Sequence, residues 1–186
     1  MAGRIMKESS LLEAVRQGEP DALGQIFDIY ASALFRYAVR LCHDPAEADR
    51  IVGDVFALLL EHLSAGRGPQ SNLRSYLYQI AYHVLVDHVR DAAHVYSMEE
   101  ALNVPDGTIS VAGMVEEREL LNELEYAVMH NLTGEQQHVI MLRYVEGFSL
   151  QETAEITGKN VNAVSVLQNR AITKLRHVLG SKFGDG

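Results

Sequence analysis

The sequence predicts an all-α protein with two small helical domains joined by a flexible linker. Apolar residues recur at three- and four-residue spacing along most of the chain, and strand-like alternation is scarce. Near the middle, Pro105, the Asp106-Gly107 pair and Gly113 interrupt this pattern, so the linker is expected at residues 93–113. With 186 residues, 47% of them hydrophobic, the chain has enough apolar material for a core and is not globally disordered.

The first domain is predicted over residues 1–92. A short helix is expected at 9–17. A longer helix is expected from Pro20 to Cys42, because proline suits a first helical turn and apolar residues, Phe27 among them, then face inward at helical spacing. Cys42 is the only cysteine, and a single cysteine excludes an intramolecular disulfide framework and a Cys-rich zinc site and fits a reducing cytosol. Because Cys42 lies in an apolar helical stretch, we interpret it as a core residue.

The third helix has the clearest start. Asp44 is a candidate N-cap, Pro45 occupies the first helical position, and Glu47 completes a capping-box pattern; the helix is expected to end near residue 62. After a loop rich in glycine, a fourth helix over residues 72–91 completes the first domain.

Negative charge is concentrated in the middle of the chain. The formal net charge is −9, from 16 basic and 25 acidic residues. Residues 98–131 hold eight of the acidic residues and one basic residue, whereas residues 157–182 hold five basic residues and no acidic ones. Net acidity therefore does not exclude nucleic acid, because the C-terminal segment has the charge that phosphate contacts require.

Two helices are expected before the most informative motif of the second domain. The first covers residues 114–130 with Leu124 on its apolar stripe, and the second covers residues 134–146. Thr133 and Gln136 form a capping-box pattern at the start of the second of these helices.

The second domain, residues 114–186, contains a helix-turn-helix pattern. Ser149 and Glu152 form a capping box that opens a short helix, Gly158 permits a left-handed turn, and Asn160 can cap the helix that follows. The second helix of such a motif presents its N-terminal side chains to the DNA major groove. The same pattern also fits a helical hairpin used only for packing.

Three segments together resemble a bacterial RNA polymerase sigma factor of the sigma-70 family, in the extracytoplasmic-function (ECF) group. They are residues 44–56, residues 73–90, and residues 132–149 with the helix-turn-helix after them. The resemblance implies two helical domains, a region 2-like domain at residues 1–92 and a region 4-like domain at residues 114–186. The order and spacing of the three segments are more specific than any one of them.

The resemblance implies that the third helix docks on core polymerase. Its acidic and apolar side chains would complement a basic polymerase surface, although a helix face exposed only to solvent has the same composition. The candidate polymerase-binding residues are Asp49, Arg50, Asp54, Val55 and Phe56.

The fourth helix and the loop before it are implied to hold the −10 element. Tyrosine side chains there can stack on bases that leave the duplex, although core packing is the alternative and is expected for at least one of the three tyrosines. The candidate −10 residues are Arg67, Asn72, Arg74, Tyr76, Tyr78, Gln79, Tyr82, His83 and Arg90.

The helix-turn-helix is implied to bind the −35 element through base and phosphate contacts. Val166 and Leu167 stand on the face expected to meet DNA, where they would contact thymine methyl groups or form a protein-binding patch. The candidate −35 residues are Ser149, Lys159, Asn160, Asn162, Ala163, Ser165, Val166, Asn169, Arg170 and Lys174.

The implied function is a transcription initiation factor in the cytoplasm that binds core RNA polymerase and promoter DNA, with an anti-sigma factor or another regulatory protein as partner. No enzyme motif, metal site, cofactor site or membrane insertion is expected; His83, Asp87 and His88 are interpreted as helix surface. One alternative is a degenerate sigma-like interaction protein, because Asp91-Ala92-Ala93-His94 replaces the Arg run usual in the family. The other is a dimeric helix-turn-helix repressor.

Overall fold

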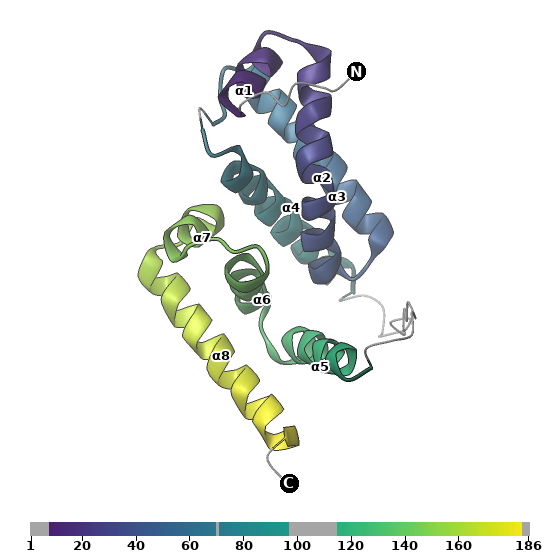
Figure 1. Ribbon diagram of the computed structural model, residues 1–186, viewed down its shortest axis with the longest axis vertical. Coiled ribbons are helices and arrows are strands. Elements are labelled where there is room, and N and C mark those ends of the chain that lie inside the picture. Colours follow the sequence, from purple (N-terminus) through teal and green to yellow (C-terminus); the bar gives the residue numbers. More distant parts are fainter. Residues whose placement is uncertain (1–7, 70, 97–114, 184–186) are drawn as a thin grey trace.

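Four helices form an N-terminal unit and four form a C-terminal unit (Figure 1). The computed structural model describes residues 8–69, 71–96 and 115–183, and within these ranges all regular structure is helical, which confirms the predicted all-α class. The N-terminal unit consists of α1 (Glu8–Arg16), α2 (Pro20–Cys42), α3 (Pro45–Ser64) and α4 (Leu73–Tyr96). The C-terminal unit consists of α5 (Val115–Asn131), α6 (Gly134–Ile140) with the π-helical turn η1 (Met141–Val145), α7 (Leu150–Thr157) and α8 (Val161–Phe183).

The predicted N-caps are present. The Asp44 carboxylate accepts the Ala46 amide at 2.8 Å, although Glu47 does not complete the expected box, because its carboxylate binds Arg50 and His88 instead. Both C-terminal boxes are complete: the Thr133 and Gln136 pair opens α6, and the Ser149 and Glu152 pair opens α7. Each box satisfies amides that the first helical turn leaves without a partner.

Two boundaries differ from the predicted ones. Helix α4 continues to Tyr96, four residues into the segment expected to be linker. The expected helix at residues 134–146 changes to a π-helical turn at Met141, where the Glu146 amide donates to the Met141 carbonyl at 2.9 Å. The rest of the predicted linker, residues 97–113, lies outside the described residues.

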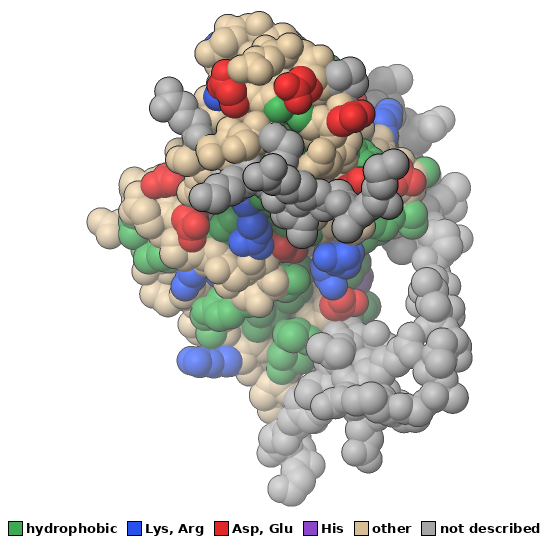
Figure 2. Space-filling view, turned by 45° about the horizontal axis from the view of Figure 1, so that its top comes forward, with side chains coloured by type: hydrophobic (Ala, Val, Ile, Leu, Met, Phe, Trp, Pro, Cys, Tyr) green, Lys and Arg blue, Asp and Glu red, His purple; other side chains and the backbone are tan. Residues whose placement is uncertain are grey.

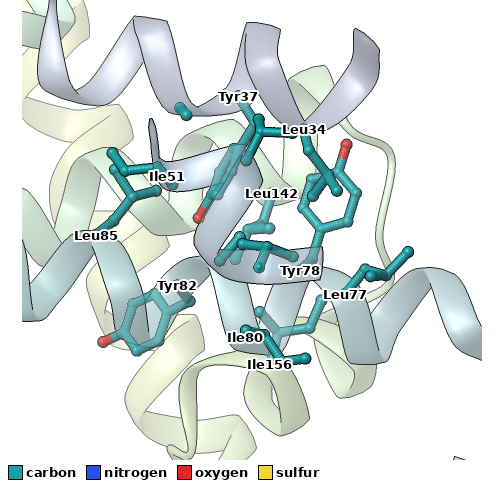
Figure 3. Close-up of a cluster of buried hydrophobic side chains, with 14 of the residues drawn as sticks. Leu34, Tyr37, Ile51, Leu77, Tyr78, Ile80, Tyr82, Leu85, Leu142 and Ile156 are labelled. Carbon is teal, nitrogen blue, oxygen red and sulfur yellow. The ribbon is translucent and has the colours of Figure 1, made fainter. Parts of the chain in front are cut away.

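One hydrophobic core runs through both units. Tyr37 of α2 and Tyr78 of α4 are buried in the same cluster as Leu142 of η1 and Ile156 of α7 (Figure 3). The Tyr37 and Tyr78 rings lie 5.1 Å apart, centroid to centroid. The two units are therefore packed against each other through large buried side chains.

Three apolar side chains are less buried than the helical spacing predicted. Phe27 on α2 is 46% exposed, and Leu124 on α5 is 39% exposed, so neither belongs to the core. Cys42 is half-buried at the end of α2, and its thiol donates to the Asp44 carbonyl at 3.3 Å. Among the described residues, no helix combines the length and apolar character needed to cross a membrane.

Candidate functional site

An acidic surface lies on α3 where polymerase contact was predicted. Asp49, Arg50 and Asp54 are exposed, as helical spacing requires for side chains opposite the core face. The Arg50 guanidinium contacts the Glu47 carboxylate at 2.6 Å, and His88 of α4 contacts the same carboxylate at 2.6 Å. The His88 contact joins the charged face of α3 to α4.

The apolar part of that surface differs from the prediction. Val55 is fully buried and Phe56 is almost so, because both lie on the core side of α3; Val55 is therefore not a surface contact residue. Phe27 of α2 instead covers Phe56, with 4.8 Å between ring centroids, and is the aromatic side chain that reaches solvent. The sequence placed Phe27 inward because it continues the helical apolar pattern, so no local signal marked it as exposed.

The candidate −10 residues of α4 divide between a buried face and a face that reaches solvent. Tyr78 and Tyr82 are buried, whereas Tyr76 is partly exposed and shares a 2.8 Å hydrogen bond with His62 of α3. His83 is exposed, and its Nδ1 lies 2.7 Å from the Gln79 carbonyl of its own helix. The burial of Tyr78 and Tyr82 agrees with the alternative that these tyrosines pack in the hydrophobic core.

A carboxylate from the C-terminal unit meets this helix. The Tyr78 hydroxyl donates a hydrogen bond to the Glu146 carboxylate. The Arg74 guanidinium donates to the Glu146 carbonyl at 2.5 Å, lies 3.5 Å from its carboxylate, and stacks 4.1 Å from the Phe148 ring centroid. Burial and the neighbouring carboxylate raise the pKa of Tyr78, so the phenol stays protonated and donates. Sequence reasoning missed Glu146, whose role depends on contacts distant in sequence.

The loop before α4 is open to solvent. Arg67 and Asn72 are exposed, and the Arg67 guanidinium lies 3.8 Å from the Glu61 carboxylate. Asn72 adopts a left-handed conformation, φ 65°, immediately before α4 begins. The side chain of Arg90, the remaining −10 candidate, lies outside the described part of the structure.

The helix-turn-helix forms as predicted between α7 and α8. Gly158 adopts φ 65° in the turn, and the Asn160 side chain accepts the Ala163 amide at 2.8 Å as the N-cap of α8. Ser149 likewise caps α7. Ser149 and Asn160 therefore have structural roles at the two helix starts, beside any contact with DNA.

The exposed face of α8 carries the remaining −35 candidates. Leu167 was expected to be exposed, but it is partly buried against the small cluster of Val139, Ala154 and Val164, whereas Val166 is 46% exposed. Ala163 and Ser165 are partly exposed. The −35 candidates on α8 that are exposed are Asn162, Val166, Asn169, Arg170 and Lys174.

Lys159 is held by an ion pair. Its ammonium contacts the Glu135 carboxylate at the start of α6, and this contact raises the pKa of Lys159. The pair ties the turn of the helix-turn-helix to α6. A phosphate that binds Lys159 would compete with Glu135 for the ammonium.

The fold and these surfaces define a two-unit helical protein that carries a helix-turn-helix. The family model "Sigma-70 region 2" matches residues 26–95, and "Sigma-70, region 4" matches residues 128–177. The chain is 29% identical over 176 residues to the ECF RNA polymerase sigma factor BldN of Streptomyces coelicolor, covering 91% of this chain and 64% of BldN. It is 24% identical over 157 residues to the ECF RNA polymerase sigma factor SigX of Bacillus subtilis, covering 81% of this chain and 80% of SigX.

A solved structure has the same fold. The structure of CnrH in complex with the cytosolic domain of CnrY matches 94% of this chain and 97% of CnrH, with a TM-score of 0.68 and 22% identity. With both regions matched in order, the chain belongs to the sigma-70 family and, within it, to the ECF group of sigma factors, which direct RNA polymerase to promoters.

Proposed function

We propose that this protein is a transcription initiation factor that binds core RNA polymerase and recognises promoters at the −10 and −35 elements. The observation that carries this proposal is the ordered pair of regions, in which α8 exposes Asn162, Arg170 and Lys174 on one helix of a helix-turn-helix. The protein itself makes and breaks no covalent bond, and it acts in the cytoplasm, where polymerase is found.

Each surface has a task in this proposal. The α3 surface of Asp49, Arg50 and Asp54, with Phe27 beside it, binds core polymerase. Helix α4 binds the unpaired −10 strand by stacking and through Arg74. Helix α8 enters the major groove at the −35 element.

A regulatory protein is part of the proposal. The relative CnrH forms a complex with the cytosolic domain of CnrY, and an anti-sigma factor for this chain would cover its polymerase-binding surfaces. The exposed Val166 favours a second candidate, a sigma-like protein that binds polymerase or a regulator through α8 without promoter recognition.

The test combines the purified protein, core polymerase and a library of genomic fragments from the same organism. Transcripts that start at a common promoter motif and require the protein support the proposal. A stable complex with core polymerase that initiates at no fragment supports the second candidate. Tight binding to palindromic DNA without polymerase binding would identify a repressor.

A further inference from the structure

The loop from Ser64 of α3 to Leu73 of α4 (the α3–α4 loop) is tied to the first helix of the N-terminal unit. The Arg16 guanidinium, in the last turn of α1, donates a hydrogen bond of 2.7 Å to the Pro69 carbonyl, 53 residues away in sequence. Figure 1 shows this loop passing beside α1. A guanidinium that donates to a carbonyl forms a charge-assisted hydrogen bond, which is stronger than a bond between neutral groups. Arg16 therefore restrains the loop from a third helix.

Helix α1 is a firm support for this bond. Its side chains Leu11, Leu12 and Val15 are buried in the hydrophobic core. The Arg16 side chain is only 26% exposed, and its second terminal nitrogen lies 3.7 Å from the Glu13 carboxylate. Because the arginine is already restrained on its own helix, little further side-chain entropy is lost when it binds the loop.

The part of the loop next to α3 is held by α3 itself. The Arg67 amide donates to the His62 carbonyl at 2.8 Å. Gly68 has φ 109° and lies so close to Leu63 that a Cβ at this position would be 3.0 Å from the Leu63 Cδ2. Helix α3 thus determines the path of the backbone up to Gly68, and Arg16 holds the next residue, Pro69.

The loop carries exposed polar side chains on both sides of Pro69. Arg67 and Asn72 are exposed, and both are −10 candidates. The Arg67 guanidinium lies 3.8 Å from the Glu61 carboxylate, but both side chains are 66% exposed. An ion pair between such exposed groups holds a side chain only weakly. The position of Arg67 therefore depends mainly on the backbone of the loop.

Charge alone does not make this end of the molecule a DNA-binding surface. Figure 2 turns the end that carries α1 toward the viewer, and acidic and basic side chains are interspersed there. Sequence-independent attraction to phosphates requires clustered basic groups, whereas base recognition requires a few correctly placed ones. Such groups must be held within about 0.5 Å of the productive geometry.

We propose that Arg16 is a positioning residue for recognition of the −10 element: by holding the Pro69 carbonyl, it fixes the loop that places Arg67 and Asn72 against the unpaired strand. Arg16 itself does not contact DNA. The inference rests on the proposed function, because it takes Arg67 and Asn72 as −10 contacts. Without the bond, the loop adopts the binding conformation for a smaller fraction of the time, and apparent affinity falls by that fraction.

The test compares Arg16→Met, which keeps an apolar stem but removes the donors, with Arg16→Lys, which keeps a cationic donor. Arg36→Met is the matched control, because it removes the same charge from an exposed position on α2. Each full-length protein is combined with core polymerase, and the complex is mixed with short single-stranded DNA of randomised sequence. Sequencing of the bound strands measures the enrichment of preferred bases. Hydrogen–deuterium exchange of the free protein measures the protection of the Arg67 amide.

Arg16→Met is expected to lower the enrichment of preferred bases about tenfold, since a hydrogen bond from a charged group contributes on this scale. It should also speed exchange of the Arg67 amide. Arg16→Lys should restore part of the enrichment, and Arg36→Met should match the wild type. All variants should bind core polymerase equally, because the α3 surface is unchanged.

Wild-type enrichment in Arg16→Met would overturn the proposal, as would equal losses in Arg16→Met and Arg36→Met or no rescue by Arg16→Lys. A loss of enrichment together with polymerase binding would also overturn it, because that result indicates a general loss of structure. Failure of the proposed function is separate: the wild-type protein would then form no complex with core polymerase, or its complex would enrich no base.

Discussion

Tyr37 of α2 and His138 of α6 are 101 residues apart in sequence and share a buried hydrogen bond of 2.8 Å. The Tyr82 ring of α4 packs against the same imidazole, with 4.8 Å between ring centroids. His138 is 6% exposed, and burial lowers its pKa from 6.5 to about 4, against a small opposing effect of Glu135. A neutral histidine is therefore part of the contact between the two units.

Acidification is expected to weaken this contact. Between pH 6.5 and about pH 4, the His138 imidazole takes up a proton when the units separate or unfold, but it stays neutral while the two units are packed together. The free energy of unfolding therefore falls as the pH falls. The full loss is about 3 kcal/mol, from a pKa difference of about 2.5. Urea unfolding at several pH values across this interval measures it. The pKa of Glu152 is lowered by its bonds to Ser149, so its own contribution is lost only at pH values below 4.5.

His138→Phe keeps an aromatic ring beside Tyr37 and Tyr82 and removes the titrating group. This variant should lose most of the pH dependence in that interval, whereas His130→Gln, at an exposed histidine of α5, should retain it. The same pH dependence in wild type and His138→Phe would refute the assignment to His138.

Local signals in the sequence were sufficient for the elements and the helix-turn-helix. Thr133 with Gln136, and Ser149 with Glu152, act within one helical turn, so their residue types and spacing determine the helix starts. Gly158 follows the same logic, because a left-handed turn between two short helices strongly favours glycine.

The contact between the units was not predictable in this way. Tyr78 and Glu146 are 68 residues apart and Tyr37 and His138 are 101 apart, and neither pair has a spacing that local periodicity can show. Phe27 fits the apolar stripe of α2 but covers Phe56 from the solvent side, because the edge of that stripe extends past the core. Val55 is the opposite case, because it was expected at the surface and is buried. Its position in the motif does not show whether its side chain faces solvent or the core.

Two glycine substitutions should change stability in opposite directions. Gly158→Ala is expected to destabilise the protein by about 1 kcal/mol, because φ 65° is unfavourable for alanine. Gly53→Ala is expected to stabilise it by up to about 1 kcal/mol, because Gly53 lies in the exposed middle of α3 and alanine favours the helix. A Cβ at either position meets no atom within 4 Å, so the difference is conformational. Urea unfolding of both variants is the measurement; a gain for Gly158→Ala would contradict the left-handed turn.

Reversal of one charge on α3 should weaken the polymerase complex. Asp49→Lys is expected to lower affinity for core polymerase about tenfold, because it places a like charge against a basic surface. The expected loss is smaller at high salt, since exposed charges are screened. Biolayer interferometry at two salt concentrations measures both effects.

The control for this experiment is Glu13→Lys on α1, which makes the same change of charge at an exposed site outside the α3 surface. Equal losses for the two variants would show that net charge, and not the α3 surface, determines the affinity.

The last prediction concerns α8. Lys174 is exposed four residues after Arg170, on the same helix face. We propose that it contacts a DNA phosphate. Lys174→Ala should weaken binding of the polymerase complex to promoter fragments of any −35 sequence by a similar factor, and should reduce the salt slope by about one. Arg176→Ala removes the same charge from the opposite side of α8, about 200° around the helix from Lys174, and should leave the slope unchanged. Titration of promoter fragments over a range of salt concentrations compares the two. A sequence-dependent loss for Lys174→Ala would reassign Lys174 from a phosphate to a base.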